Sequence, residues 1–174
     1  MKNGIAASVA LALFVAGVGV GVAAQKRIGA EAYRGQTPRQ AADALLDTAR
    51  VLAESDSWEH IAIGRIYYLG GDKAKGQAIF DGILADDHED SDEFRIARVY
   101  REAGDWDKAK GMFDRYFLRN PKHTTEMATV GAYYLLQGDR AGAEQLFDRA
   151  FASKPEVWAS IAAGGAYLGV APQE

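Results

Sequence analysis

Residues 100–114, YREAGDWDKAKGMFD, decide the fold of this chain, because two further stretches repeat their pattern. These are residues 67–81, YYLGGDKAKGQAIFD, and residues 134–148, YLLQGDRAGAEQLFD. In each stretch a tyrosine is followed after four residues by Gly-Asp and after thirteen by Phe-Asp. The three stretches begin at Tyr67, Tyr100 and Tyr134, and self-similarity at such a regular period is typical of stacked repeats.

Each stretch predicts a hairpin of two helices that meet at the Gly-Asp. Small or apolar residues recur before it at i, i+3, i+4 and i+7, which is one face of an α-helix. The glycine supplies the left-handed turn that ends this first helix. After it, a small residue and a phenylalanine lie on one face of the second helix, and we expect the phenylalanine to fill the gap to the next hairpin. The expected contact positions are His60, Ile63, Gly64, Tyr67, Gly76 and Phe80; Glu93, Ile96, Ala97, Tyr100, Ala109 and Phe113; and Met127, Val130, Gly131, Tyr134, Ala143 and Phe147.

At these residues the chain resembles the tetratricopeptide repeat family, whose pattern runs W-x2-L-G-x2-Y, then A-x3-F, then P. Three repeats match at most positions, over about residues 57–88, 90–121 and 124–155. The first-helix aromatic is replaced in all three, by His60, Glu93 and Met127. The resemblance implies an all-α fold, a right-handed superhelical array of antiparallel helix hairpins (an α-solenoid). It also implies a protein–protein interaction module that is not an enzyme.

Flanking helices are expected at both ends of the repeats. Thr37-Pro38 places a capping residue before proline, which favours a cap helix over residues 37–54. Residues 156–168 have small residues and a tyrosine in phase with the repeats, and they predict a final half-repeat. We therefore expect one helical repeat domain over residues 37–170, preceded by a linker over residues 25–36.

The first 24 residues predict an export or membrane element. The run from Ile5 to Ala24 has 20 residues and no charge, which is long enough for a transmembrane helix. Val22-Ala23-Ala24 also suits a signal-peptide cleavage site. Both readings, a cleaved signal peptide and an N-terminal apolar anchor helix, stay open. Either one favours a bacterial envelope protein, periplasmic or anchored in the inner membrane, with membrane contact through residues 5–24.

Composition and motifs exclude several classes of function. The chain has no cysteine and a formal charge of −4, so thiolate zinc sites are excluded and a nucleic-acid partner is not expected. It has no Gly-x-Ser-x-Gly, His-Glu-x-x-His or phosphate-binding glycine loop, and we expect no catalytic residue, cofactor or metal. The acidic run 86–93 has oxygen ligands for calcium but lacks the glycine of an EF-hand loop. We interpret it as a solvated turn before the next helix.

The remaining candidate is a groove on the first helices, one residue beyond the core positions. It would be apolar and aromatic with an arginine row, in which Arg65 and Arg98 lie roughly 10 Å apart by helix packing distance. Tyrosine and arginine are typical interface anchors, so we expect a peptide or partner helix with an acidic residue between hydrophobic ones. The alternative is that Ile61 and Phe94 pack between hairpins. The predicted groove residues are Trp58, Ile61, Arg65, Tyr68, Phe94, Arg98, Arg101 and Leu135.

Two functions agree with this sequence. The first is an interaction module, an adaptor or scaffold exported to or anchored at the bacterial envelope. The second is a membrane-anchored structural or assembly subunit of a larger envelope complex.

Overall fold

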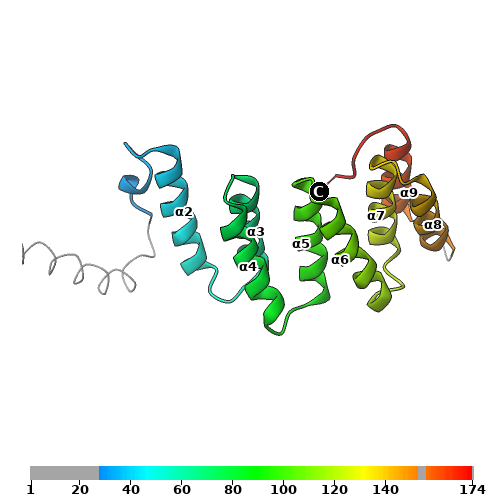
Figure 1. Cartoon of the computed structure of the whole chain (residues 1–174), viewed down its shortest axis with the longest axis horizontal. Helices are drawn as coiled ribbons and strands as arrows, with labels where there is room; N and C mark the ends of the chain where they lie inside the picture. Colours follow the sequence, from blue (N-terminus) through cyan, green and yellow to red (C-terminus); the bar gives the residue numbers. More distant parts are fainter. Residues whose placement is uncertain (1–27, 153–155, 174) are drawn as a thin grey trace, which may run out of the picture. The chain divides into compact units, whose positions relative to one another are not determined.

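The computed structural model describes residues 28–152 and 156–173, and the described part of the chain is helical without a strand. A short 3-10 helix, η1 (Ala30–Ala32), precedes eight α-helices within these ranges (Figure 1). The helices are α2 (Pro38–Leu52), α3 (Ser57–Leu69), α4 (Lys73–Ala85), α5 (Asp90–Glu102), α6 (Trp106–Arg119), α7 (Thr124–Leu136), α8 (Arg140–Phe151) and α9 (Val157–Tyr167). The predicted all-α class and the helical repeat are therefore confirmed.

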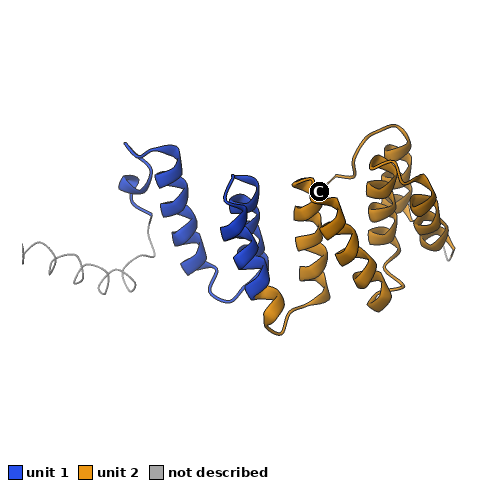
Figure 2. Cartoon of the chain, viewed as in Figure 1, with its two compact units in different colours: residues 1–82 blue, residues 83–174 orange. Residues whose placement is uncertain are grey.

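The chain divides into two compact units, whose boundary lies between Gly82 and Ile83 in the last turns of α4 (Figure 2). Unit 1 has its described residues in η1, α2, α3 and most of α4. Unit 2 holds the end of α4 and helices α5 to α9.

Glycines end the first helix of each repeat as the sequence predicts. Gly71, Gly104 and Gly138 have φ values of 94°, 78° and 88°. This left-handed region is open to glycine and strained for most other residues. The chain can therefore reverse within two or three residues, and the second helix returns along the first.

Close approach between the two helices of a hairpin explains the small residues in their interiors. A Cβ atom added to Gly64 would lie 2.5 Å from Cε1 of Phe80, and one added to Gly131 would lie 2.7 Å from Cε1 of Phe147. A Cβ at Gly76 would lie 2.7 Å from Cβ of Tyr68. Only a residue without a side chain lets the neighbouring helix come this near.

The predicted core register is confirmed by burial. Sixteen of the eighteen predicted contact positions are buried, and His60 and Glu93 at the first helical turns are half-buried. One detail of the prediction was incomplete, because Phe80 and Phe147 pack first on the glycines of their own hairpins. Phe113 contacts both its own hairpin, at Phe94, and the next first helix, at Tyr133. The Phe113 ring therefore fills space inside its own hairpin as well as space between this hairpin and the next.

The segments outside the repeats are partly described. Thr37 caps α2: its hydroxyl accepts a hydrogen bond from the Gln40 amide, and the Gln40 side chain accepts one from the Thr37 amide. The predicted export or anchor element at residues 1–24, with its apolar helix, lies outside the described residues. Pro155, the proline that ends the third predicted repeat, also lies outside them. No helix within residues 28–152 and 156–173 is long and apolar enough to cross a membrane. The domain boundaries stay predictions.

Candidate functional site

The eight predicted groove residues divide between the two units. Trp58, Ile61, Arg65 and Tyr68 lie on α3 in unit 1, whereas Phe94, Arg98 and Arg101 lie on α5 and Leu135 lies on α7 in unit 2. A single groove through both sets, with its spacing of Arg65 from Arg98, therefore stays a prediction.

In unit 1 the four residues differ sharply in exposure. Trp58, in the first turn of α3, is 63% exposed, and its amide donates a hydrogen bond to the capping carboxylate of Asp56. Ile61 and Tyr68 are only 4% and 3% exposed. The Tyr68 ring packs 5.7 Å from the ring of Phe80, between the helices of the hairpin. A partner that touches this face would meet Trp58 and the half-buried Arg65.

In unit 2 the candidate residues connect successive first helices. The Arg101 guanidinium on α5 lies 4.3 Å from the ring centre of Tyr133 on α7, a cation–π distance. Leu135 packs beside a small buried cluster of Ala132, Ala162 and Ala166 between α7 and α9. The cation–π contact holds the arginine against the helix that follows it in the array.

Phe94 serves the hairpin of α5 and α6. Its ring centre lies 5.4 Å from that of Phe113 and 4.9 Å from that of Tyr116. Phe94 is half-buried, so part of its surface faces outward. Phe94 therefore packs within its own hairpin and Ile61 is buried, while packing between hairpins and the predicted contact of both residues with a partner stay untested.

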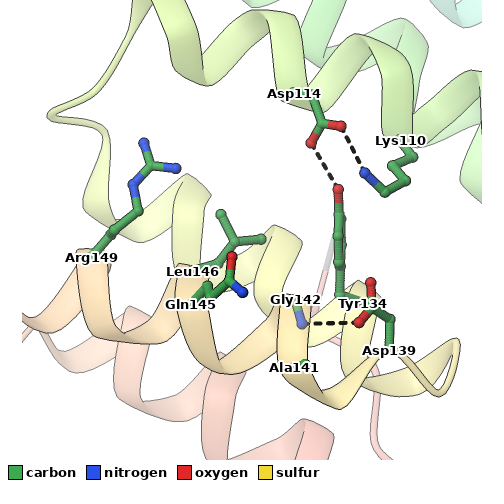
Figure 3. Close-up of a pocket in the computed structure, with 9 residues that line it drawn as sticks. All are labelled: Lys110, Asp114, Tyr134, Asp139, Ala141, Gly142, Gln145, Leu146 and Arg149. Carbon is green, nitrogen blue, oxygen red and sulfur yellow. Dashed lines mark hydrogen bonds and ion pairs between the residues drawn. The ribbon is translucent and has the colours of Figure 1, made fainter.

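A polar pocket in unit 2 was not predicted. It has a volume of about 400 Å³ and lies between α6, α7 and α8 (Figure 3). Lys110 and Asp114 from α6 line one wall, and Arg149 of α8 lies across from them. Its lining residues are Lys110, Asp114, Tyr134, Asp139, Ala141, Gly142, Gln145, Leu146 and Arg149.

Tyr134 is the centre of a hydrogen-bonded cluster in this pocket. Its hydroxyl donates to Asp114 at 2.8 Å, and Lys110 donates to the same carboxylate at 2.8 Å (Figure 3). Burial, with the hydrogen bond to Asp114, raises the pKa of Tyr134 to about 12, although Lys110 acts in the opposite direction. The carboxylate and the tyrosine raise the pKa of Lys110 as well. The tyrosine is therefore neutral and the lysine charged at ordinary pH, and the cluster joins α6 to α7.

Similar tyrosine–carboxylate contacts recur where one hairpin meets the next within a unit. The Tyr167 hydroxyl donates to Glu144 of α8 at 3.3 Å. In unit 1, Tyr67 accepts a hydrogen bond from Lys75 at 2.8 Å, and a hydrogen bond from Tyr67 helps to lower the pKa of Asp43, after the larger effect of Arg39. The sequence held only part of the signal for these contacts: the tyrosines share one period, but Asp114 belongs to a Phe-Asp dipeptide whereas Asp43 and Glu144 lie one helical turn before the equivalent position. The partner of each tyrosine lies one hairpin earlier, and periodicity alone does not identify it.

The acidic run 86–93 is engaged in protein contacts. Arg119 pairs with Asp90 at 2.6 Å and with Glu93, and the Asn120 amide donates to Asp90 at 3.0 Å. Asn120 and Arg119 lower the pKa of Asp90. Asp92, which is 1% exposed, accepts from the Glu89 amide in the capping box of α5. Within the described residues, no group of three histidines or carboxylates is placed to hold a metal ion.

Comparison with known families supports the repeat assignment. Residues 93–123, which cover most of α5, all of α6 and the turn beyond them, match a family model described as tetratricopeptide repeat. The predicted resemblance is thereby confirmed for this part of the chain. Searches of curated proteins and of solved structures gave no match.

Proposed function

We propose that the chain is a protein-interaction module that binds a peptide or partner helix on the outer face of its first helices. The tetratricopeptide match over residues 93–123 suggests protein–protein interaction, and this family is generally non-catalytic. The observation that carries the choice of surface is Trp58, a large aromatic side chain that is 63% exposed on the same face of α3 as the half-buried Arg65, two helical turns away. Tryptophan and arginine are the residue types that most often dominate binding energy at interfaces.

The proposed contact surface is smaller than the one expected from sequence alone. Ile61 and Tyr68 are nearly fully buried, so they act as support for the surface. Each unit contributes its own exposed or half-buried members, which are Trp58 and Arg65 on α3 in unit 1, and Phe94, Arg98 and Arg101 on α5 with Leu135 on α7 in unit 2.

The chemistry of this surface favours a ligand segment with an acidic residue flanked by hydrophobic ones. A carboxylate can pair with a guanidinium in two parallel hydrogen bonds, which gives direction as well as affinity. Apolar contact area comes from Trp58 in unit 1 and, separately, from Phe94 and Leu135 in unit 2. Part of the attraction is electrostatic, so binding weakens as salt concentration rises.

A pair of charge-reversal variants tests the choice of face. Full-length chain is used to capture partners from envelope extracts, and the partners are quantified by mass spectrometry. Arg65→Glu with Arg98→Glu should abolish capture of the main partner while helical content is retained. Arg115→Glu with Arg149→Glu, on the exposed surfaces of α6 and α8, makes the same change in net charge and should leave capture intact. Loss of the partner only in the α6 and α8 variant would assign binding to the second helices instead.

We also propose that this module acts at the bacterial envelope, because the uncharged run from Ile5 to Ala24 suits export or anchoring. The competing function is a structural or assembly subunit that stays in the membrane through this segment. The mass of the native N-terminus separates them. A mature chain that begins at Gln25 supports an exported adaptor, and an intact N-terminus in the membrane fraction supports the anchored subunit.

A further inference from the structure

The last helix carries an apolar face that nothing within the described residues covers. Val157, Trp158, Ile161 and Leu168, on α9 and directly after it, are between 55% and 83% exposed. Residues 157–173 contain no charged side chain, although a quarter of the whole chain is charged. The outer face of a terminal helix in a repeat array is normally polar. A contiguous exposed apolar face of this kind marks an interaction site.

Gly164 shows what kind of element fits this face. It lies at the position in α9 that Gly64 and Gly131 hold in α3 and α7, counted in whole repeats along the sequence. Those two glycines are buried against the phenylalanine rings of their second helices, Phe80 and Phe147. A Cβ at Gly164 would meet nothing within 4 Å. Since glycine weakens a helix relative to alanine and nothing here requires it, α9 has the form of a first helix whose second helix comes from elsewhere.

The other end of the chain carries the complementary half. Leu46-Asp47 in α2 lies one repeat length before Phe80-Asp81, and Ala42 lies one repeat length before Gly76. By this register α2 is a second helix. Before it, residues 28–36 form only the 3-10 helix Ala30–Ala32. Ala42 and Leu46 are half-buried, whereas their counterparts in the complete repeats are buried.

We propose that α2 of a second copy of this chain docks on α9 and completes the last repeat, so that copies associate head to tail. Leu46 of the incoming copy would lie on Gly164, as Phe80 lies on Gly64. Ala42 would lie beside Leu168, as Gly76 lies beside Tyr68.

A second copy fits this face by its charge as well as by its register. The charged groups on one side of α2 are engaged inside unit 1: Arg39 pairs with Asp43 and Asp72, and Lys75 lies 3.8 Å from Asp47. The adjoining side of α2, which carries Ala42, Leu45, Leu46 and Ala49, offers small and apolar residues to an uncharged α9. The contact joins two different surfaces, so it is heterologous. After each added copy, one α2 surface and one α9 surface remain free.

Engineered cysteines test the proposal, because the natural chain contains none. At the equivalent pair, a Cβ atom added to Gly76 would lie 2.7 Å from Cβ of Tyr68. Positions 42 and 168 both carry side chains, so their helices would stand slightly farther apart, at the roughly 3.5–4.5 Å Cβ separation that a disulfide needs. Full-length Leu168→Cys and Ala42→Cys chains are mixed, oxidised with copper phenanthroline and run on a non-reducing gel. We expect a mixed disulfide-linked dimer, and a ladder of longer products when both cysteines are on one chain.

The control replaces Leu118, which is 81% exposed on α6 against 83% for Leu168. Mixed dimers of Ala42→Cys with Leu168→Cys should exceed those with Leu118→Cys by about tenfold, the ratio given by a preference of about 1.4 kcal/mol. Equal yields from the two would overturn the proposal. So would efficient self-linking of Leu168→Cys alone, which would indicate a two-fold contact between α9 helices. Protection of the position 168 thiol by phosphatidylglycerol vesicles without mixed dimers would assign the face to a membrane and overturn it too.

Discussion

Gly131 lies in the middle of α7, at a position where glycine weakens an isolated helix by about 1 kcal/mol relative to alanine. The structure explains its presence, because an added Cβ would lie 2.7 Å from the Phe147 ring and 3.2 Å from the Ala143 carbonyl oxygen. Gly111 on α6 differs, since its added Cβ would meet only the end of the Arg115 side chain, at 3.7 Å. Two glycines in the same unit therefore have opposite consequences.

We expect Gly131→Ala to destabilise the fold by about 1–3 kcal/mol, because the helices must separate or the ring must move. Gly111→Ala should stabilise it by about 0.5–1 kcal/mol, since it adds a helix former at an open position. Urea unfolding of the two variants, with similar m-values, measures both effects. Equal changes in unfolding free energy would show that helix propensity, and not close approach, governs these sites.

Tyr134 makes the stability of unit 2 sensitive to alkaline pH. Burial raises its pKa to about 12, while an unfolded tyrosine titrates near 10. The unfolded chain loses this proton first, so the contribution is complete below about pH 10 and is lost as pH rises towards 12. Between about pH 9 and pH 11, the unfolding free energy of the wild type should fall more than that of Tyr134→Phe. Parallel curves for the two proteins would assign the alkaline loss to other groups.

At the element scale, the hairpins followed directly from the sequence. The repeat period located Gly71, Gly104 and Gly138 at turns with positive φ, and the i, i+3, i+4 and i+7 positions are largely buried. The prediction succeeded because the same residue spacing places the same contact positions on one face of each helix. The repeat pattern was less informative for the positions one residue after these. Ile61 and Tyr68 are buried there, although the sequence predicts an outer face. A repeat helix touches neighbours on more than one side, so its buried arc is wider than that of a helix packed on one side.

The contacts between hairpins were harder to foresee. Asp114 and Tyr134 belong to different repeats, so their contact depends on how α7 packs on α6. The contact of Arg119 with Asp90 lies within one hairpin, and it depends on how α6 packs on α5. Their residue types are visible in the sequence, but the pairing depends on tertiary packing. The partner surface itself stays a prediction.

The middle repeat should tolerate truncation least. Phe113 is fully buried and contacts both Phe94 of its own hairpin and Tyr133 of the next. Phe113→Ala should cost about 3–5 kcal/mol, more than Phe80→Ala or Phe147→Ala, because repeats nearer the ends fray more easily. Denaturation midpoints of the three variants provide the ranking. A midpoint for Phe113→Ala above the other two would contradict the register proposed for the array.

Calcium should bind the turn before α5 no tighter than about millimolar, since the acidic run lacks an EF-hand glycine. The ion would also have to displace Arg119 and Asn120 from Asp90. Isothermal titration calorimetry of the wild type and of Asp90→Asn measures this. A micromolar site that Asp90→Asn removes would reverse the interpretation of this run as a structural turn.

At the scale of the whole molecule, two different surfaces have separate roles. The first-helix face, with Trp58 exposed on α3, is proposed to bind a partner protein, whereas the two ends of the array are proposed to bind each other. A chain of copies joined through α2 and α9 would present the partner-binding face many times. A multivalent partner would then bind more tightly without any new contact, because its later binding events occur at a high effective concentration. Variants at positions 42 and 168 would lower this gain and leave the affinity of a single site unchanged.

The most direct test of the central claim, that the first-helix face binds a protein, is site-specific photo-crosslinking in cells. Benzoylphenylalanine is introduced in place of Trp58 on α3 or, as the control, in place of Leu118, which is 81% exposed on α6. We expect a discrete crosslinked partner from position 58, weakened by Arg65→Glu, and no such band from position 118. A partner band from position 118 alone would contradict it and place recognition on the second helices.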